Sequence, residues 1–115
     1  MQDFRNLDVW NKAHALALSV YRETKDFPKD ELFGMTMQMR RSAAAIATRI
    51  AEGCGRDGNL DFAVDLRKAK ASCSELEYSV LLSHDLGMCS DGVHQRMTTD
   101  TVEVRRMIHG LLRTL

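Results

Sequence analysis

The sequence holds four histidines, and a metal centre is the first chemistry that they could support. Di-iron sites in helical bundles use two Glu-x-x-His pairs together with further inward carboxylates. None of the four histidines has a glutamate three residues before it. Asp91 and His94 come closest, once, at an expected helix start. We therefore interpret the histidines as helix-face residues and expect no metal ion and no other cofactor.

The sequence gives equally little support for a cysteine nucleophile or for a nucleotide-binding site. Cys54, Cys73 and Cys89 have no C-x-x-C spacing, and their odd number suits reduced thiols better than a disulfide framework. Cys54 follows an expected helix carboxyl end, where the helix dipole raises a thiol pKa and lowers its reactivity. No G-x-x-x-x-G-K-S/T or G-x-G-x-x-G segment occurs. The sequence therefore predicts a protein that is not an enzyme.

The charged residues are unevenly distributed along the chain, and a segment rich in basic residues could bind phosphate groups. Residues 40–70 carry seven bases against four acids, residues 71–103 carry one against six, and the last twelve residues carry three bases and no acid. Such segregation could build a basic patch for RNA or DNA, repeated by symmetry in an oligomer. The alternative is a solvated helical surface with complementary charges between subunits. The candidate nucleic-acid contacts are Arg40, Arg41, Arg49, Arg56, Arg67, Lys68 and Lys70.

Glu52 stands in the last turn of an expected helix, where the helix dipole disfavours a carboxylate. A glutamate in that position needs a cationic partner, and Arg56 or an arginine from another helix could supply it. We expect Glu52 and Arg56 to form a structural ion pair that fixes the turn after the helix or a contact between subunits. A catalytic role is disfavoured, because no second acid, histidine or nucleophile lies at a matching helical spacing.

The composition of the whole chain narrows these alternatives. Among its 115 residues, sixteen Lys and Arg balance sixteen Asp and Glu, which excludes a globally basic nucleic-acid binder. One proline and 6% aromatic residues favour helices over a sandwich or barrel. The longest apolar run, 43–47, is far shorter than the roughly 18 residues of a membrane span, and no signal-peptide pattern opens the sequence. We expect a cytoplasmic protein without membrane association.

Apolar residues at alternating three- and four-residue steps predict four amphipathic helices in a single domain, 1–115. These helices are expected at residues 6–26, 30–53, 59–86 and 91–114. The third has the most regular seam, with the spacing of helices that pack nearly parallel or antiparallel. The seam consists of Phe62, Leu66, Ala69, Cys73, Leu76, Val80 and Ser83. Because all connections are short, we predict an all-α, antiparallel up-down-up-down four-helix bundle.

Apolar residues spill beyond one stripe on the first two helices. Phe33, Met35, Met37 and Met39 should face several directions within two turns of a regular helix. A monomeric bundle has no use for apolar side chains on its outer face, so some of them should meet another subunit. The sequence therefore predicts a homo-oligomer.

Several segments together resemble one bacterial family. They are Leu7-x-Val9-Trp10, Phe27-Pro28, Gln38-x-Arg40-Arg41-Ser42, Ile50-Ala51-Glu52-Gly53-x-Gly55-Arg56 and Glu75-Leu76-Glu77. This pattern is similar to that of the 23S rRNA intervening-sequence proteins, which are related to the accessory variability determinants of diversity-generating retroelements. The resemblance covers about residues 4 to 87.

The resemblance implies a four-helix bundle that assembles as a pentameric ring and has no catalytic activity. It also implies, for the retroelement accessory members, binding of nucleic acid and a reverse transcriptase through a basic surface. Two functions are therefore expected to compete. The first is a non-catalytic, homo-oligomeric scaffold that docks a protein partner, and the second is a nucleic-acid-binding accessory protein that uses the basic patch.

Overall fold

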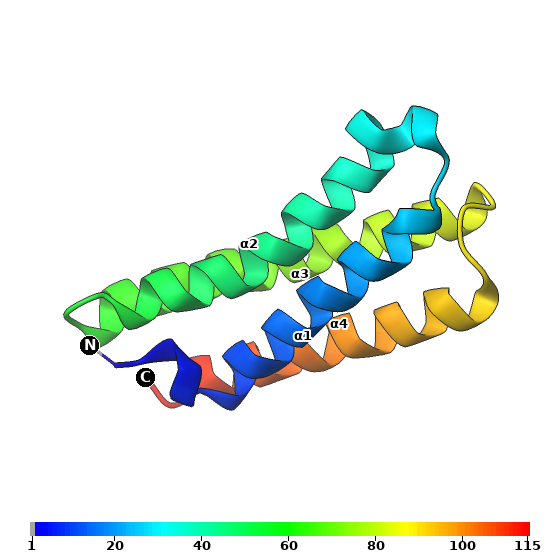
Figure 1. Cartoon of the computed structure of the whole chain (residues 1–115). Helices are drawn as coiled ribbons and strands as arrows, with labels where there is room; N and C mark the ends of the chain where they lie inside the picture. Colours follow the sequence, from blue (N-terminus) through cyan, green and yellow to red (C-terminus); the bar gives the residue numbers. More distant parts are fainter. Residues whose placement is uncertain (1) are drawn as a thin grey trace.

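Four antiparallel helices make up the computed structural model, which describes residues 2–115 (Figure 1). The helices are α1 (Asp8–Glu23), α2 (Met37–Cys54), α3 (Asn59–Asp85) and α4 (Asp91–Leu112). Residues 2–115 contain no strand, and they form an elongated body of 43 × 22 × 20 Å. The predicted all-α four-helix bundle is therefore confirmed.

The core is built by the inner faces of all four helices. The predicted seam of α3 is buried along its length, and Leu66, Cys73 and Leu76 have no exposed surface. Ile46 and Ile50 of α2 pack into the same core cluster, as do residues of α1 and α4. This burial supplies the main stabilisation, because each fully buried aliphatic side chain contributes about 1.5–3 kcal/mol.

The carboxyl end of α2 and the start of α3 approach each other closely at Gly53. A Cβ atom at this position would lie 2.7 Å from Cδ1 of Phe62 and 3.1 Å from Cβ of Asp65. Only glycine fits at this position, because a real Cβ atom essentially never lies closer than 3.0 Å to such a neighbouring atom. Gly53 therefore fixes the tight packing of α2 on α3 at this end of the bundle.

The start of the second helix differs from the prediction. Residues 30–53 were expected to be helical, but α2 begins at Met37, and an irregular stretch at Leu32–Thr36 precedes it. Gly34 leaves the helical region there (φ −107°, ψ −111°). The segment before α2 consequently bends away from the body of the bundle at one end (Figure 1). Its Phe33 is 82% exposed.

The fourth helix is tied to its neighbours by ion pairs. Ser90 caps its start by accepting a hydrogen bond from the amide of Val93 at 3.2 Å. Along its length, Arg105 pairs with Glu77 of α3, whereas Arg96 pairs with Glu23 and Glu103 with Lys12, both on α1. These contacts fix α4 between α1 and α3. Within residues 2–115, no helix combines the length and apolar character that crossing a membrane would require.

Candidate interaction surfaces

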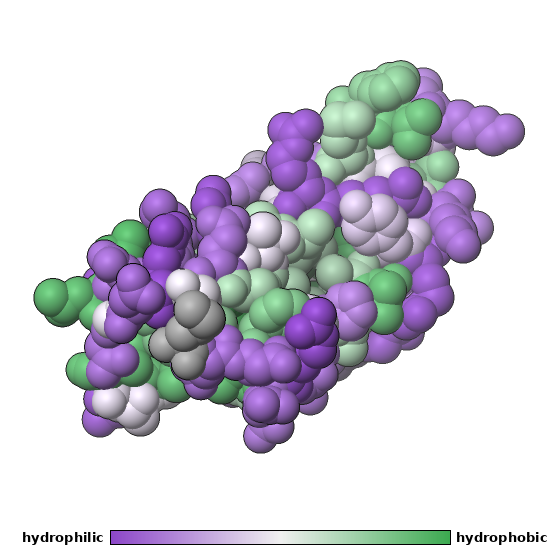
Figure 2. Space-filling model, turned by 60° about the vertical axis from the view of Figure 1, so that its left-hand side comes forward, coloured by the Kyte–Doolittle hydropathy of each residue, from purple (hydrophilic) through white to green (hydrophobic). Residues whose placement is uncertain are grey.

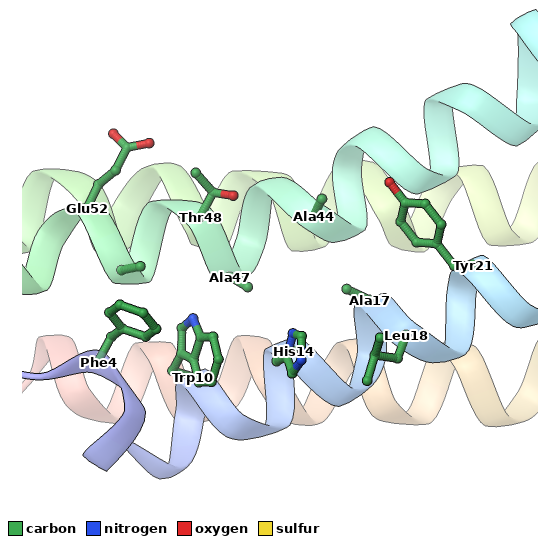
Figure 3. Close-up of a pocket in the computed structure, with 11 residues that line it drawn as sticks. Phe4, Trp10, His14, Ala17, Leu18, Tyr21, Ala44, Ala47, Thr48 and Glu52 are labelled. Atoms are coloured by element: carbon green, nitrogen blue, oxygen red, sulfur yellow. The ribbon is translucent and has the colours of Figure 1, made fainter.

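An apolar groove of about 540 Å³ runs between α1 and α2. The two helices diverge there, and side chains from both point into the space between them (Figure 3). The groove is lined by Phe4, Trp10, His14, Ala17, Leu18, Tyr21, Ala44, Ala47, Thr48, Ala51 and Glu52. Figure 2 shows apolar side chains gathered in a hollow on one face of the molecule, with hydrophilic residues on both sides.

The α1 wall of this groove is an aromatic ladder. The rings of Phe4 and Trp10 lie 4.7 Å apart at an angle of 56°, and Trp10 stacks on His14 at 5.0 Å and 8°. Trp10 and His14 are four residues apart and therefore share one face of α1. Leu18 and Tyr21 extend this wall, and both are more than 40% exposed. The ladder thus presents apolar surface to the groove, and its Phe4 and Trp10 also pack in part against the core.

The α2 wall is made of small residues. Ala44, Ala47, Thr48 and Ala51 bring the backbone of α2 close to the groove, and Glu52 lies at one end (Figure 3). Small side chains on one wall and aromatic rings on the other leave room for large side chains from outside.

A second apolar surface lies on the outer face of α3, and the sequence reasoning missed it. The outer row of α3 repeats at steps of four and three residues and points away from the buried seam. It consists of Leu60, Val64, Arg67, Ala71, Ser74, Tyr78 and Leu81, all of them exposed. Leu60 is 85% exposed and Tyr78 59%. The signal was present in the sequence as a second heptad pattern, on the side of α3 opposite to Phe62 and Leu66.

The apolar surplus that was predicted before α2 is only in part on the surface. Met35 and Met39 are buried in the core, with 7% and 0% exposed surface, which agrees with the expectation that these residues face several directions. Phe33 and Met37 are exposed, as is Leu32 beside them. Met35 and Met39 are four residues apart, as are Phe33 and Met37, so each pair shares one helical face, one of them buried and the other exposed.

The basic residues of α2 are already engaged within the chain. Arg40 donates from Nε to Oγ1 of Thr24 at 2.8 Å, and its guanidinium lies 4.9 Å from the centre of the Tyr21 ring. Arg49 pairs with Glu52 at 3.6 Å. Arg41 contacts the sulfur of Met37 at 3.4 Å. Arg40 and Arg49 are also separated by about 13 Å along the helix, at 1.5 Å per residue. Each of these three arginines therefore has a partner within the chain.

The structure corrects the expected ion pair between Glu52 and Arg56, because each of these two residues pairs with a different residue. Nε of Arg56 lies 2.8 Å from a carboxylate oxygen of Asp65, which is 2% exposed. This hydrogen bond raises the pKa of Arg56. The turn after α2 is thus fixed by an arginine, as expected, but the partner is a buried carboxylate of α3. Glu52 is paired with Arg49, one turn earlier.

The basic residues of α3 meet those of α4. Nζ of Lys70 lies 3.0 Å from Nδ1 of His109. Arg106, His109 and Arg113 are three and four residues apart, so they share one face of α4. Together with Arg67, which is one turn before Lys70, they form what we call the α3–α4 basic seam; Lys68 is exposed nearby.

The histidines and cysteines do not form a metal site in the described part of the chain, where no cluster of three or more His, Cys, Asp and Glu side chains could hold an ion. Nε2 of His84 donates to Asp91 at 2.6 Å, and the His84 ring stacks on His94 at 4.3 Å. The hydrogen bond with Asp91 raises the pKa of His84, and in turn lowers the pKa of Asp91. Burial raises the pKa of Cys73 to about 12, so this thiol is unreactive.

The fold places the protein among small four-helix bundles, and a comparison with solved structures finds the same fold. The chain is similar to a crystal structure of a protein of unknown function from the S23 ribosomal protein family of Bacteroides thetaiotaomicron. The TM-score is 0.82 at 20% identity, over 90% of this chain and 97% of that chain. None of the curated proteins matches the chain. The sequence profile of the 23S rRNA-intervening sequence proteins matches residues 5–110, and the chain belongs to this family.

Proposed function

We propose that this protein is a non-catalytic scaffold that associates with copies of itself, and that a second copy covers the groove between α1 and α2. The observation that carries this proposal is the apolar α1 side of the groove, where Leu18 and Tyr21 are exposed by 46% and 44% and Phe4 and Trp10 are partly exposed. Contiguous apolar patches on soluble monomers are rare and mark interaction sites when they are rimmed by polar residues. Covering the groove would remove these rings from water, at about 25 cal/mol for each Å².

The chemistry of the groove supports binding over catalysis. Its ionisable side chains are His14, Tyr21 and Glu52. The imidazole of His14 stacks on Trp10, and Glu52 is paired with Arg49 at the end of the groove. General acid–base catalysis needs a positioned pair within hydrogen-bond reach of a reacting group, whereas this surface offers rings and methyl groups.

Light scattering tests the proposal. The wild-type chain is expected to have a mass that is a multiple of 13.0 kDa. Thr48→Arg places a long cation in the groove at an exposed position and should reduce the mass to that of the monomer. Thr99→Arg is the matched control, because Thr99 is an exposed threonine of α4 outside the groove, and it should keep the wild-type mass. A wild-type mass of 13.0 kDa at all concentrations would contradict the proposal.

Nucleic-acid binding is the second candidate function, and the contact of Lys70 with His109 favours it. This contact joins the basic part of α3 to the basic end of α4, so that Arg67, Arg106 and Arg113 lie along one seam. Each copy in an oligomer would add the same phosphate contacts.

Binding of a fluorescent structured RNA at two salt concentrations tests this second function. Binding through the seam should weaken as salt rises, and Arg106→Glu with Arg113→Glu should lower the salt slope by about one per lost contact. Arg22→Glu is the control, because Arg22 is an exposed arginine on α1. Equal RNA binding by all variants would mean that RNA contacts another surface. If the wild type binds no RNA even at low salt, the scaffold function is the one that remains.

A further inference from the structure

We propose that a pocket in the connection between α1 and α2 binds a small organic phosphate. The pocket has a volume of about 400 Å³ and is lined by residues of the connection from Thr24 to Leu32 and by Thr36 and Arg40 at the start of α2. We call it the Arg40 pocket. It lies at the end of the molecule away from the chain termini (Figure 1). It shares no lining residue with the α1–α2 groove, so the site is independent of the proposed self-association.

The backbone of the connection brings two lysines to this pocket. Two short 3-10 turns, Thr24–Asp26 and Lys29–Glu31, come before and after Phe27. Phe27 has an extended backbone and is only 6% exposed, so it anchors the connection to the core. Lys25 of the first turn and Lys29 of the second turn both line the pocket. The connection therefore places two basic side chains at one cavity.

Arg40 is held at the same pocket by neutral groups. Its Nε donates to Oγ1 of Thr24 at 2.8 Å, and one of its terminal nitrogens donates to the carbonyl oxygen of Tyr21 at 3.3 Å. A guanidinium group has further N–H donors, which remain for a ligand. The chain thus orients Arg40 without neutralising its positive charge.

The positive charge of the Arg40 pocket is uncompensated. Within residues 2–115, none of its three basic side chains forms an ion pair with a carboxylate. Asp26, Asp30 and Glu31 are close in the sequence, but none of them lines the pocket. Like charges around one cavity repel each other, and an anion between them relieves this repulsion. The pocket therefore favours a negatively charged ligand.

A phosphate monoester matches these groups better than a carboxylate does. It carries a charge of about −1.5 to −2 at pH 7 and three strong acceptor oxygens. An arginine can donate to two phosphate oxygens at once, and lysines act as point charges beside it. Thr36 is 3% exposed, and its side chain makes no hydrogen bond in the part of the chain that the structure describes. Its hydroxyl is therefore a further donor for the ligand.

The remaining lining of the pocket is apolar and suits the organic part of such a ligand. Phe27, Pro28 and Leu32 form this part. Apolar walls with a few convergent polar groups are typical of small-molecule sites, whose volumes are about 300–1,000 Å³. We therefore expect a phosphate attached to an apolar ring or chain to bind more tightly than inorganic phosphate.

Isothermal titration calorimetry of the full chain with phenyl phosphate tests the site. Phenyl phosphate should bind about 10-fold more tightly than inorganic phosphate, because part of its ring leaves water on Phe27 and Leu32. Benzoate should bind more weakly than phenyl phosphate, because it has the ring but a smaller charge. No binding of phenyl phosphate at millimolar concentrations would overturn the proposal. Equal affinity for phenyl phosphate and inorganic phosphate would overturn the assignment of an organic ligand.

A pair of double variants locates the bound phosphate. Lys25→Ala with Lys29→Ala removes two charges from the pocket and should weaken binding of phenyl phosphate by about 2- to 30-fold. Arg67→Ala with Lys68→Ala is the matched control, because it removes two exposed charges from α3, outside the pocket, and should keep the wild-type affinity. All four positions are exposed, so helicity by circular dichroism should be unchanged. Equal affinities of the two double variants would overturn the proposal.

Arg40→Lys separates the charge of Arg40 from its planar set of donors. The variant keeps the positive charge but loses the N–H groups that pair with two oxygens, and it should bind phenyl phosphate about 10-fold more weakly. Wild-type affinity in this variant would overturn the role of Arg40 as the residue that orients the phosphate.

Discussion

The two sides of α2 are built in opposite ways. Toward α3, Ile46 and Ile50 are fully buried, and Gly53 allows a contact so close that a single methyl group would collide with Phe62. Toward α1, the small residues Ala44 and Ala47 line an open groove. The difference teaches that the chain completes its own core on one side of α2 and leaves an open apolar groove on the other.

Truncation of a core side chain should give the largest loss of stability. The comparison is between the inner and the outer face of α3. Leu66→Ala removes a fully buried side chain and should lower the free energy of unfolding by about 2–5 kcal/mol. Val64→Ala, two residues away in the outer row, should change it by at most about 0.5 kcal/mol in the monomer. Chemical denaturation of both variants in the Thr48→Arg background measures this. Similar losses would mean that the outer row is part of the monomer core.

A methyl group at the close approach should give an intermediate effect. Gly53→Ala places a Cβ against Phe62 and Asp65 and should destabilise the fold by about 1–3 kcal/mol, as overpacking does. Gly92→Ala is the matched control in α4, because nothing lies within 4 Å of its Cβ. It should stabilise the helix by up to about 1 kcal/mol. Thermal unfolding reports both, and a neutral Gly53→Ala would show that this side of α2 is loosely packed.

The smallest effect concerns pH at the turn between α3 and α4. The raised pKa of His84 contributes stability that is complete below its ordinary value of 6.5 and is lost as the pH rises through the folded value. The lowered pKa of Asp91 contributes stability above its ordinary 3.8 and is lost as the pH falls through the folded value. Asp85, 3.4 Å from His84, and the stacked His94 face the same pair.

Melting temperatures of the wild type and Asp91→Asn across the pH range measure this effect. Their difference should be largest between about pH 4 and 6.5, where both groups are charged, and should shrink at higher pH. A difference that is independent of pH would show that Asp91 acts only through helix-start geometry.

Sequence periodicity predicted the buried side of the molecule well, for a physical reason. The inner seam of α3 repeats without interruption, so a single helix with a single buried face accounts for Leu66 and Leu76. The start of α2 could not be placed in this way, because Gly34 lies among apolar residues that continue a helical pattern. Only the non-helical backbone of Gly34 shows where the regular helix can begin.

The α1–α2 groove and the partners of the basic residues were harder to predict from the sequence than the core. The partner of Arg56 is Asp65, nine residues later and on the next helix, so the pairing depends on how α2 turns into α3. The basic residues of α2 looked like one group along the chain, but Arg40 and Arg49 find different partners within it. The groove itself arises from the divergence of two helices, which no local spacing encodes.

Trp10 offers the most direct test of the central claim, because it is the single tryptophan of the chain and lies in the groove. Acrylamide quenching of its fluorescence would be compared between the wild type and Thr48→Arg. If a second copy covers the groove, Trp10 should be protected in the wild type and several-fold more accessible in the variant. Equal quenching in both proteins would contradict the claim that this groove is an interface.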